Sequence, residues 1–68
     1  MNSDSFRHAL SRCGISQVAA AKLFDVNERT VRRWASGEDS VPKAVQIALV
    51  LMFKLGVSVD GVEKIIRR

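Results

Sequence analysis

The sequence contains one cysteine, Cys13, and one histidine, His8, among its 68 residues. A lone cysteine excludes a disulfide within the chain, and without a Cys/His cluster there is no structural zinc site. A chain this short buries only about 60% of the surface that its unfolded form exposes, so its core is small. Domains of this size commonly gain stability from a disulfide, a metal or a partner. With the first two excluded, self-association is the remaining candidate.

Catalytic patterns are also missing. The sequence has no nucleophile–base pair, no glycine-rich phosphate loop and no acidic cluster with metal-ligand spacing. We therefore expect no catalytic residues, no metal, no cofactor and no enzymatic activity. We expect no small-molecule ligand either, because 68 residues leave no room for a separate ligand domain.

Long hydrophobic runs are absent as well. The most apolar stretch, residues 44–53, contains Gln46 and falls short of the ~20 residues needed to span a bilayer. The first residues, "MNSDSF", lack the basic start and apolar run of a signal peptide. Together with the lone cysteine, these features predict a cytoplasmic protein without membrane contact.

Positive charge is what the sequence has in excess. Lysine and arginine number 11 against 7 aspartates and glutamates, which gives a formal net charge of +4 and a sequence pI near 10.0. This balance favours a polyanion or an anionic surface as partner.

The hydrophobic pattern has the 3.6-residue period of helices, and no segment keeps the alternation of a strand. We predict an all-α chain of five helices forming one domain over residues 1–68. The helices are expected at about 4–12, 17–24, 28–36, 42–55 and 60 to the end. The signals for their ends are the predicted N-caps Ser3, Ser16 and Asn27, the opening Pro42, the stops Gly14, Gly37 and Gly56, and a capping box of Asp60 with Glu63.

The third predicted helix has two contrasting sides. On a wheel of about 100° per residue, Trp34 and Ala35 fall within about 60° of Val31 and define a buried side. Arg29 and Arg33 fall roughly opposite, beside Ser36, and Arg32 lies about a quarter turn from the core. Trp34 should therefore anchor this helix while the arginines face outward.

The stretch "QVAAAKLFDVNERTVRRW", residues 17–34, resembles the helix-turn-helix of the lambdoid repressor and Cro class, also called the XRE-like family. The fifth position of that motif is small, here Ala21. Its apolar positions are matched by Ala20, Phe24, Val26, Val31 and Trp34. One departure is Asp25, where the family usually has a glycine in left-handed conformation, which aspartate tolerates better than most residues. The resemblance implies a compact lambda-repressor-like domain that binds double-stranded DNA.

A shorter likeness is carried by "GISQ" with the alanines that follow, and by "VPKAVQIAL". These stretches are similar to small helix-turn-helix regulators encoded beside anti-CRISPR genes in phages and mobile elements. That resemblance implies a dimeric autorepressor.

Carried over by position, the family's second, recognition helix implies base contacts by Glu28, Arg29, Arg32 and Arg33. Arginine reads guanine bidentately in the major groove, and a carboxylate accepts from cytosine N4. For Glu28 a second interpretation stays open, in which it orients Arg32 by i, i+4 pairing. The expected contacts to the DNA backbone are Ser16, Gln17, Asn27, Thr30, Ser36 and Lys43.

The fourth predicted helix is apolar around nearly its whole circumference, unlike a surface helix of a monomer. We expect Val45, Ala48 and Met52 to close the core. A two-fold dimer through residues from about 47 to 68 should bury the rest: Ile47, Leu51, Leu55, Val57, Val59, Val62, Ile65 and Ile66. Alternatively, the last helix folds back and covers this surface within one chain.

Together, these features predict a dimeric transcriptional regulator, most simply an autorepressor, that reads an inverted repeat. A function of a different class also fits the basic helix. It is a protein-interaction module, such as an antitoxin or adaptor, that binds an acidic partner.

Overall fold

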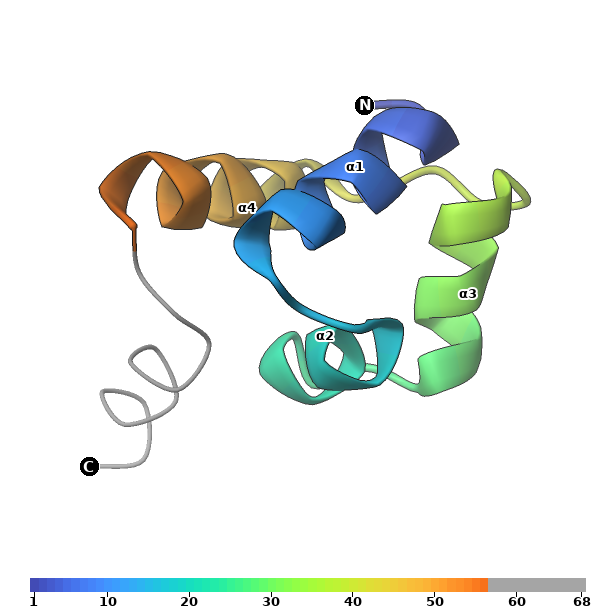
Figure 1. Ribbon diagram of the computed structural model, residues 1–68. Helices are drawn as coiled ribbons and strands as arrows, with labels where there is room; N and C mark the ends of the chain where they lie inside the picture. Colours follow the sequence, from blue (N-terminus) through green and yellow to red (C-terminus); the bar gives the residue numbers. More distant parts are fainter. Residues whose placement is uncertain (57–68) are drawn as a thin grey trace.

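The computed structural model describes residues 1–56, which form four helices and no strands. The helices are α1 (Ser3–Cys13), α2 (Gln17–Leu23), α3 (Glu28–Ser36) and α4 (Lys43–Leu55) (Figure 1). The all-α prediction is thus confirmed over this range, and the fifth helix, predicted from about residue 60, lies outside the described residues. None of the four helices is long and apolar enough to cross a membrane.

The helix ends follow the predicted signals with small shifts. The N-cap of α1 is Asn2 and not Ser3, because the Asn2 side chain accepts a hydrogen bond from the Ser5 amide at 2.7 Å, which leaves Ser3 in the first turn. Helix α2 ends one residue early, with Phe24 as its C-cap. Pro42 is the N-cap of α4 rather than its first residue. The stops Gly14, Gly37 and Gly56 are left-handed C-caps, as predicted.

Asp25 makes the tight turn between α2 and α3. Its φ is 54°, and it is the only residue other than glycine with positive φ among residues 1–56. Directly after this turn, the Val26 amide donates a hydrogen bond of 2.9 Å to the Ala21 carbonyl of α2. The predicted left-handed aspartate is confirmed, and it carries the strain of that conformation.

Replacing Asp25 with glycine should therefore stabilise the domain by about 0.5–1 kcal/mol. The released left-handed strain exceeds the extra entropy that glycine gives the unfolded chain. Urea unfolding monitored by circular dichroism measures the difference. Asp25→Ala keeps the strain and serves as the control, so equal stability of the two variants would contradict this account.

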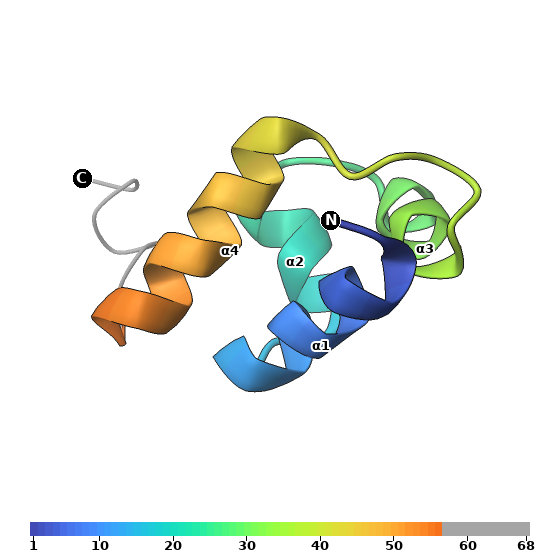
Figure 2. The same ribbon diagram turned by 90° about the horizontal axis from the view of Figure 1, so that it is seen from above.

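Helix α1 is the centre of the packing. It contacts both α3 and α4, and α2 packs against α3. Helices α1 and α4 lie side by side and run in broadly the same direction (Figure 2). Helix α3 lies at the end of the domain away from the C-terminal end of α4 (Figure 2). Phe6 of α1 is completely buried, and its ring meets that of Trp34 edge to face, with centroids 5.9 Å apart. The small core therefore ties the first helix to the third.

The inward side of α4 is slightly rotated from its predicted position. Val45 and Met52 are buried as expected, but Leu49 is the completely buried residue and Ala48 is only half-buried. Because nearly every residue of α4 is apolar, the sequence provides no polar boundary from which to locate the buried side.

Cys13, at the end of α1, is half-buried against α4. Its thiol donates to the Leu49 carbonyl at 3.7 Å. Burial raises the pKa of the Cys13 thiol, so the side chain stays neutral near pH 7. This environment agrees with the packing role expected for a small apolar side chain.

Candidate nucleic-acid interface

Helix α3 is held firmly from one side. Val31 is completely buried, and Trp34 and Ala35 are 5% exposed, which confirms the side predicted to face the core. At the start of α3 the Asn27 side chain accepts a hydrogen bond from the Arg29 amide at 2.9 Å. At its end the Arg7 side chain of α1 donates to the Ala35 carbonyl. The orientation of α3, and hence of its outer side, is therefore fixed by the core.

The outer side of α3 brings three arginines together. Arg29, Arg32 and Arg33 are exposed, and they line a shallow surface hollow of about 410 Å³ with Ser36 and Glu38. We call this feature the arginine hollow. Its three guanidinium groups offer many N–H donors and no acceptor, a chemistry that suits phosphates and the O6 and N7 atoms of guanine.

Two carboxylates oppose this charge. Glu38 Oε2 lies 3.5 Å from Arg33 Nε, and Asp39 Oδ2 lies 3.7 Å from Arg33 Nη1. Neither carboxylate was expected at the site from the sequence. The available signal was their position directly after Gly37, because a chain that leaves a helix through a left-handed glycine turns back over its last turn.

The other ion pair within residues 1–56 joins Arg7 to Asp4 on α1. Glu28 therefore makes no ion pair with Arg32 in this part of the chain, although i, i+4 pairing was one interpretation of its role. Glu28 is exposed at the start of α3 and contributes nothing to the lining of the arginine hollow.

The residues expected at the DNA backbone lie at helix ends and along α3. Ser16 caps α2 by accepting from the Ala19 amide at 3.0 Å, and Gln17 follows, half-buried. Thr30 is half-buried on α3, and the Ser36 hydroxyl donates to the Arg33 carbonyl at 3.2 Å. Lys43 is exposed at the start of α4. Asn27 is also exposed, and its side-chain oxygen caps α3. Only Ser36 among these six lines the arginine hollow.

A second exposed surface lies on α4. Ile47, Leu51 and Leu55, which were assigned to a dimer interface, are exposed by 52%, 51% and 71%. Val50 and Phe53 beside them are also about half exposed, and the guanidinium of Arg12 lies 5.3 Å from the centroid of the Phe53 ring. We call these five side chains of α4 the apolar α4 face. The other residues assigned to the dimer interface, Val57, Val59, Val62, Ile65 and Ile66, lie outside the described residues.

Comparisons with protein-family models, curated proteins and solved structures find no match to this chain.

Proposed function

We propose that this protein is a transcriptional regulator that binds double-stranded DNA in a sequence-specific way. The observation that carries the proposal is the two-sided α3. Its core-facing residues fix its orientation, and its outer side gathers Arg29, Arg32 and Arg33 around one hollow. An exposed helix of this kind fits the major groove, which is wide enough to admit it. The tight α2–α3 turn at Asp25 supports the same function, because helix-turn-helix units expose their second helix in this way.

In this proposal the arginines of α3 have two roles, the reading of bases and contact with flanking bases or phosphates. Arg29 and Arg33 read guanines from the outer side of α3, with Glu28 accepting from a cytosine and Arg32 reaching a flanking base or phosphate. Ser16, Gln17, Asn27, Thr30, Ser36 and Lys43 bind the DNA backbone and set the register without reading sequence. No cofactor takes part.

The protein acts as a homodimer in this proposal. The apolar α4 face exposes five large side chains in a domain with a small core, and monomeric proteins rarely leave so much contiguous apolar surface in water. Val57, Val59, Val62, Ile65 and Ile66 of the following segment add apolar residues to the same interface. Two-fold symmetry then pairs two α3 helices with an inverted repeat, and the dimer represses a promoter, most simply its own, by occupying it in the cytoplasm.

Selection from a random duplex library at fixed salt tests this function. The expected result is an enriched inverted repeat with half-site centres about 10–11 base pairs apart, one turn of B-DNA. Enrichment of a single half-site would keep DNA recognition and remove the dimer. No enrichment by folded protein would overturn the proposal in favour of a protein-interaction module that binds an acidic partner with the same arginines.

Arg33→Ala should weaken operator binding by about 1–3 kcal/mol and relax the preference at one base pair in each half-site. Lys22→Ala removes the same charge from the last turn of α2, outside the proposed DNA contacts and the apolar α4 face, and is the matched control. Binding of both variants to the operator and to every single-base variant of one half-site measures the effect. An equal loss on all sequences would show that Arg33 contacts phosphate rather than a base.

A further inference from the structure

Glu38 and Asp39 lie in the loop that leaves α3, residues 37–40, which we call the acidic loop. Gly37 begins this loop with a φ of 87°. The amides of Gly37 and Asp39 both donate to the Arg33 carbonyl, at 3.1 and 3.3 Å. These two hydrogen bonds hold the backbone of the acidic loop against Arg33, the same residue whose guanidinium the two carboxylates approach.

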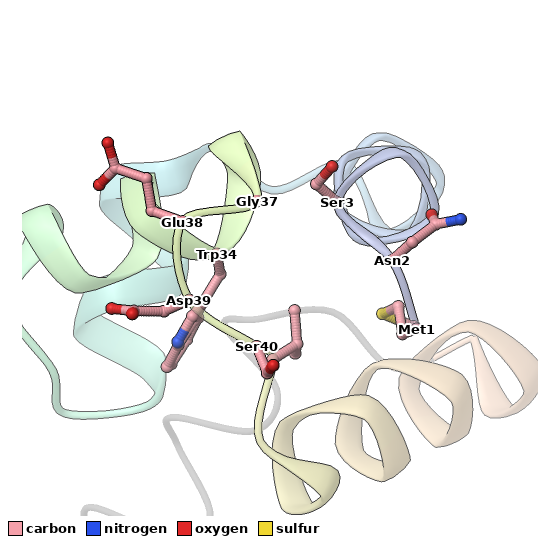
Figure 3. A pocket seen from close by; sticks show the side chains of 9 residues that line it. Met1, Asn2, Ser3, Trp34, Gly37, Glu38, Asp39 and Ser40 are labelled. Carbon is pink, nitrogen blue, oxygen red and sulfur yellow. The ribbon is translucent and has the colours of Figure 1, made fainter.

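The two carboxylates point to the same side of the acidic loop. Figure 3 shows Glu38 and Asp39 directed away from Ser3 and Met1, which line the other side of the loop. Glu38 reaches the Nε edge of the Arg33 guanidinium and Asp39 reaches Nη1. At these distances the contacts are ion pairs rather than hydrogen bonds, and they set two negative charges beside the guanidinium of Arg33 without satisfying its N–H donors.

A guanidinium with two carboxylates beside it should bind phosphate and guanine, the two kinds of DNA acceptor, with different strength. Phosphate carries a full negative charge, so a phosphate at Arg33 meets repulsion from both carboxylates. Guanine O6 and N7 are uncharged acceptors, so the same two carboxylates repel them less. The acidic loop therefore opposes phosphate more than it opposes guanine.

We infer that Glu38 and Asp39 raise the sequence discrimination of Arg33 by weakening its binding to phosphate more than its binding to guanine. This inference rests on the proposed function, because it assigns to two further residues the balance between specific and non-specific DNA. It adds the acidic loop to the determinants of specificity.

The test compares Glu38→Gln with the wild-type protein on the selected operator and on an unrelated duplex, at one salt concentration. Glu38→Gln should bind the unrelated duplex about two- to fivefold more tightly, the range of one exposed ion pair. Its binding to the operator should tighten less, so the ratio of the two affinities falls. Asp4→Asn, which changes the net charge equally but faces Arg7 on α1, should leave this ratio unchanged.

The same substitution in an Arg33→Ala background separates an effect exerted on Arg33 from an effect of general charge. If Glu38 acts through Arg33, the fall in the affinity ratio disappears in that background. Equal tightening on both duplexes, or an equal fall with and without Arg33, would overturn the inference while leaving DNA binding intact. Failure of the wild-type protein to prefer any duplex would overturn the proposed function and this inference together, and it is measured first.

Discussion

Leu51→Asp is expected to convert the proposed dimer to a monomer. Leu51 is 51% exposed in the middle of the apolar α4 face, so the free chain tolerates a charge there. In a dimer the same carboxylate would be buried without a partner, once in each subunit. We expect this to weaken association by about 2–4 kcal/mol, which is about 30- to 1000-fold in dissociation constant. Operator binding should weaken with it, because a monomer contacts only one half-site.

Sedimentation equilibrium measures the mass of wild-type and variant proteins at the same concentration. Val18→Asp on α2 is the matched control, since Val18 is 47% exposed and equally apolar but lies away from the apolar α4 face. The control should keep the mass of the dimer. A wild-type protein with the mass of one chain, or a Leu51→Asp variant that remains dimeric, would show that this surface is not the interface.

Phe6→Ala is expected to unfold much of the protein at 25 °C. Phe6 is completely buried and contacts Trp34 edge to face, so its removal leaves a cavity at the junction of α1 and α3. Truncation of a buried phenylalanine costs about 3–5 kcal/mol. A domain of this length has a total stability of only about 3–10 kcal/mol, at about 0.05–0.15 kcal/mol per residue.

Thermal and urea unfolding measure this loss. Val18→Ala is the control, because Val18 is 47% exposed on α2, lies outside the apolar α4 face, and its truncation creates no internal cavity. The control should lose less than about 1 kcal/mol. If the two truncations cost the same, Phe6 would not be the centre of the core.

The accuracy of the sequence-based predictions depended on how strongly each helix separates polar from apolar residues. In α3 the contrast is large, so a helical wheel correctly placed Val31, Trp34 and Ala35 inside and the arginines outside. In α4 the contrast is small. The sequence predicted the burial of Val45 and Met52 but missed that of Leu49, because the inward and outward sides of such a helix carry the same kinds of apolar residue.

Interactions that depend on how a loop folds back were harder to predict. The pairing of Glu38 and Asp39 with Arg33 follows from the hydrogen bonds of Gly37 and Asp39 to the Arg33 carbonyl. No periodic pattern in the sequence encodes that geometry. The choice of Asn2 over Ser3 as the cap of α1 is a similar case, since both residues are good caps and only the course of the backbone distinguishes them.

Helices α3 and α4 stand toward opposite ends of the domain, and α1 packs against both of them (Figures 1 and 2). The exposed side chains of α3 are not part of the buried core that contains Phe6, Val31 and Leu49. Under the proposed function, substitutions there give descendants of this protein new operators while the pairing of subunits is inherited unchanged. The same separation would make the domain a practical scaffold for engineering, in which target sequence and subunit pairing are altered one at a time.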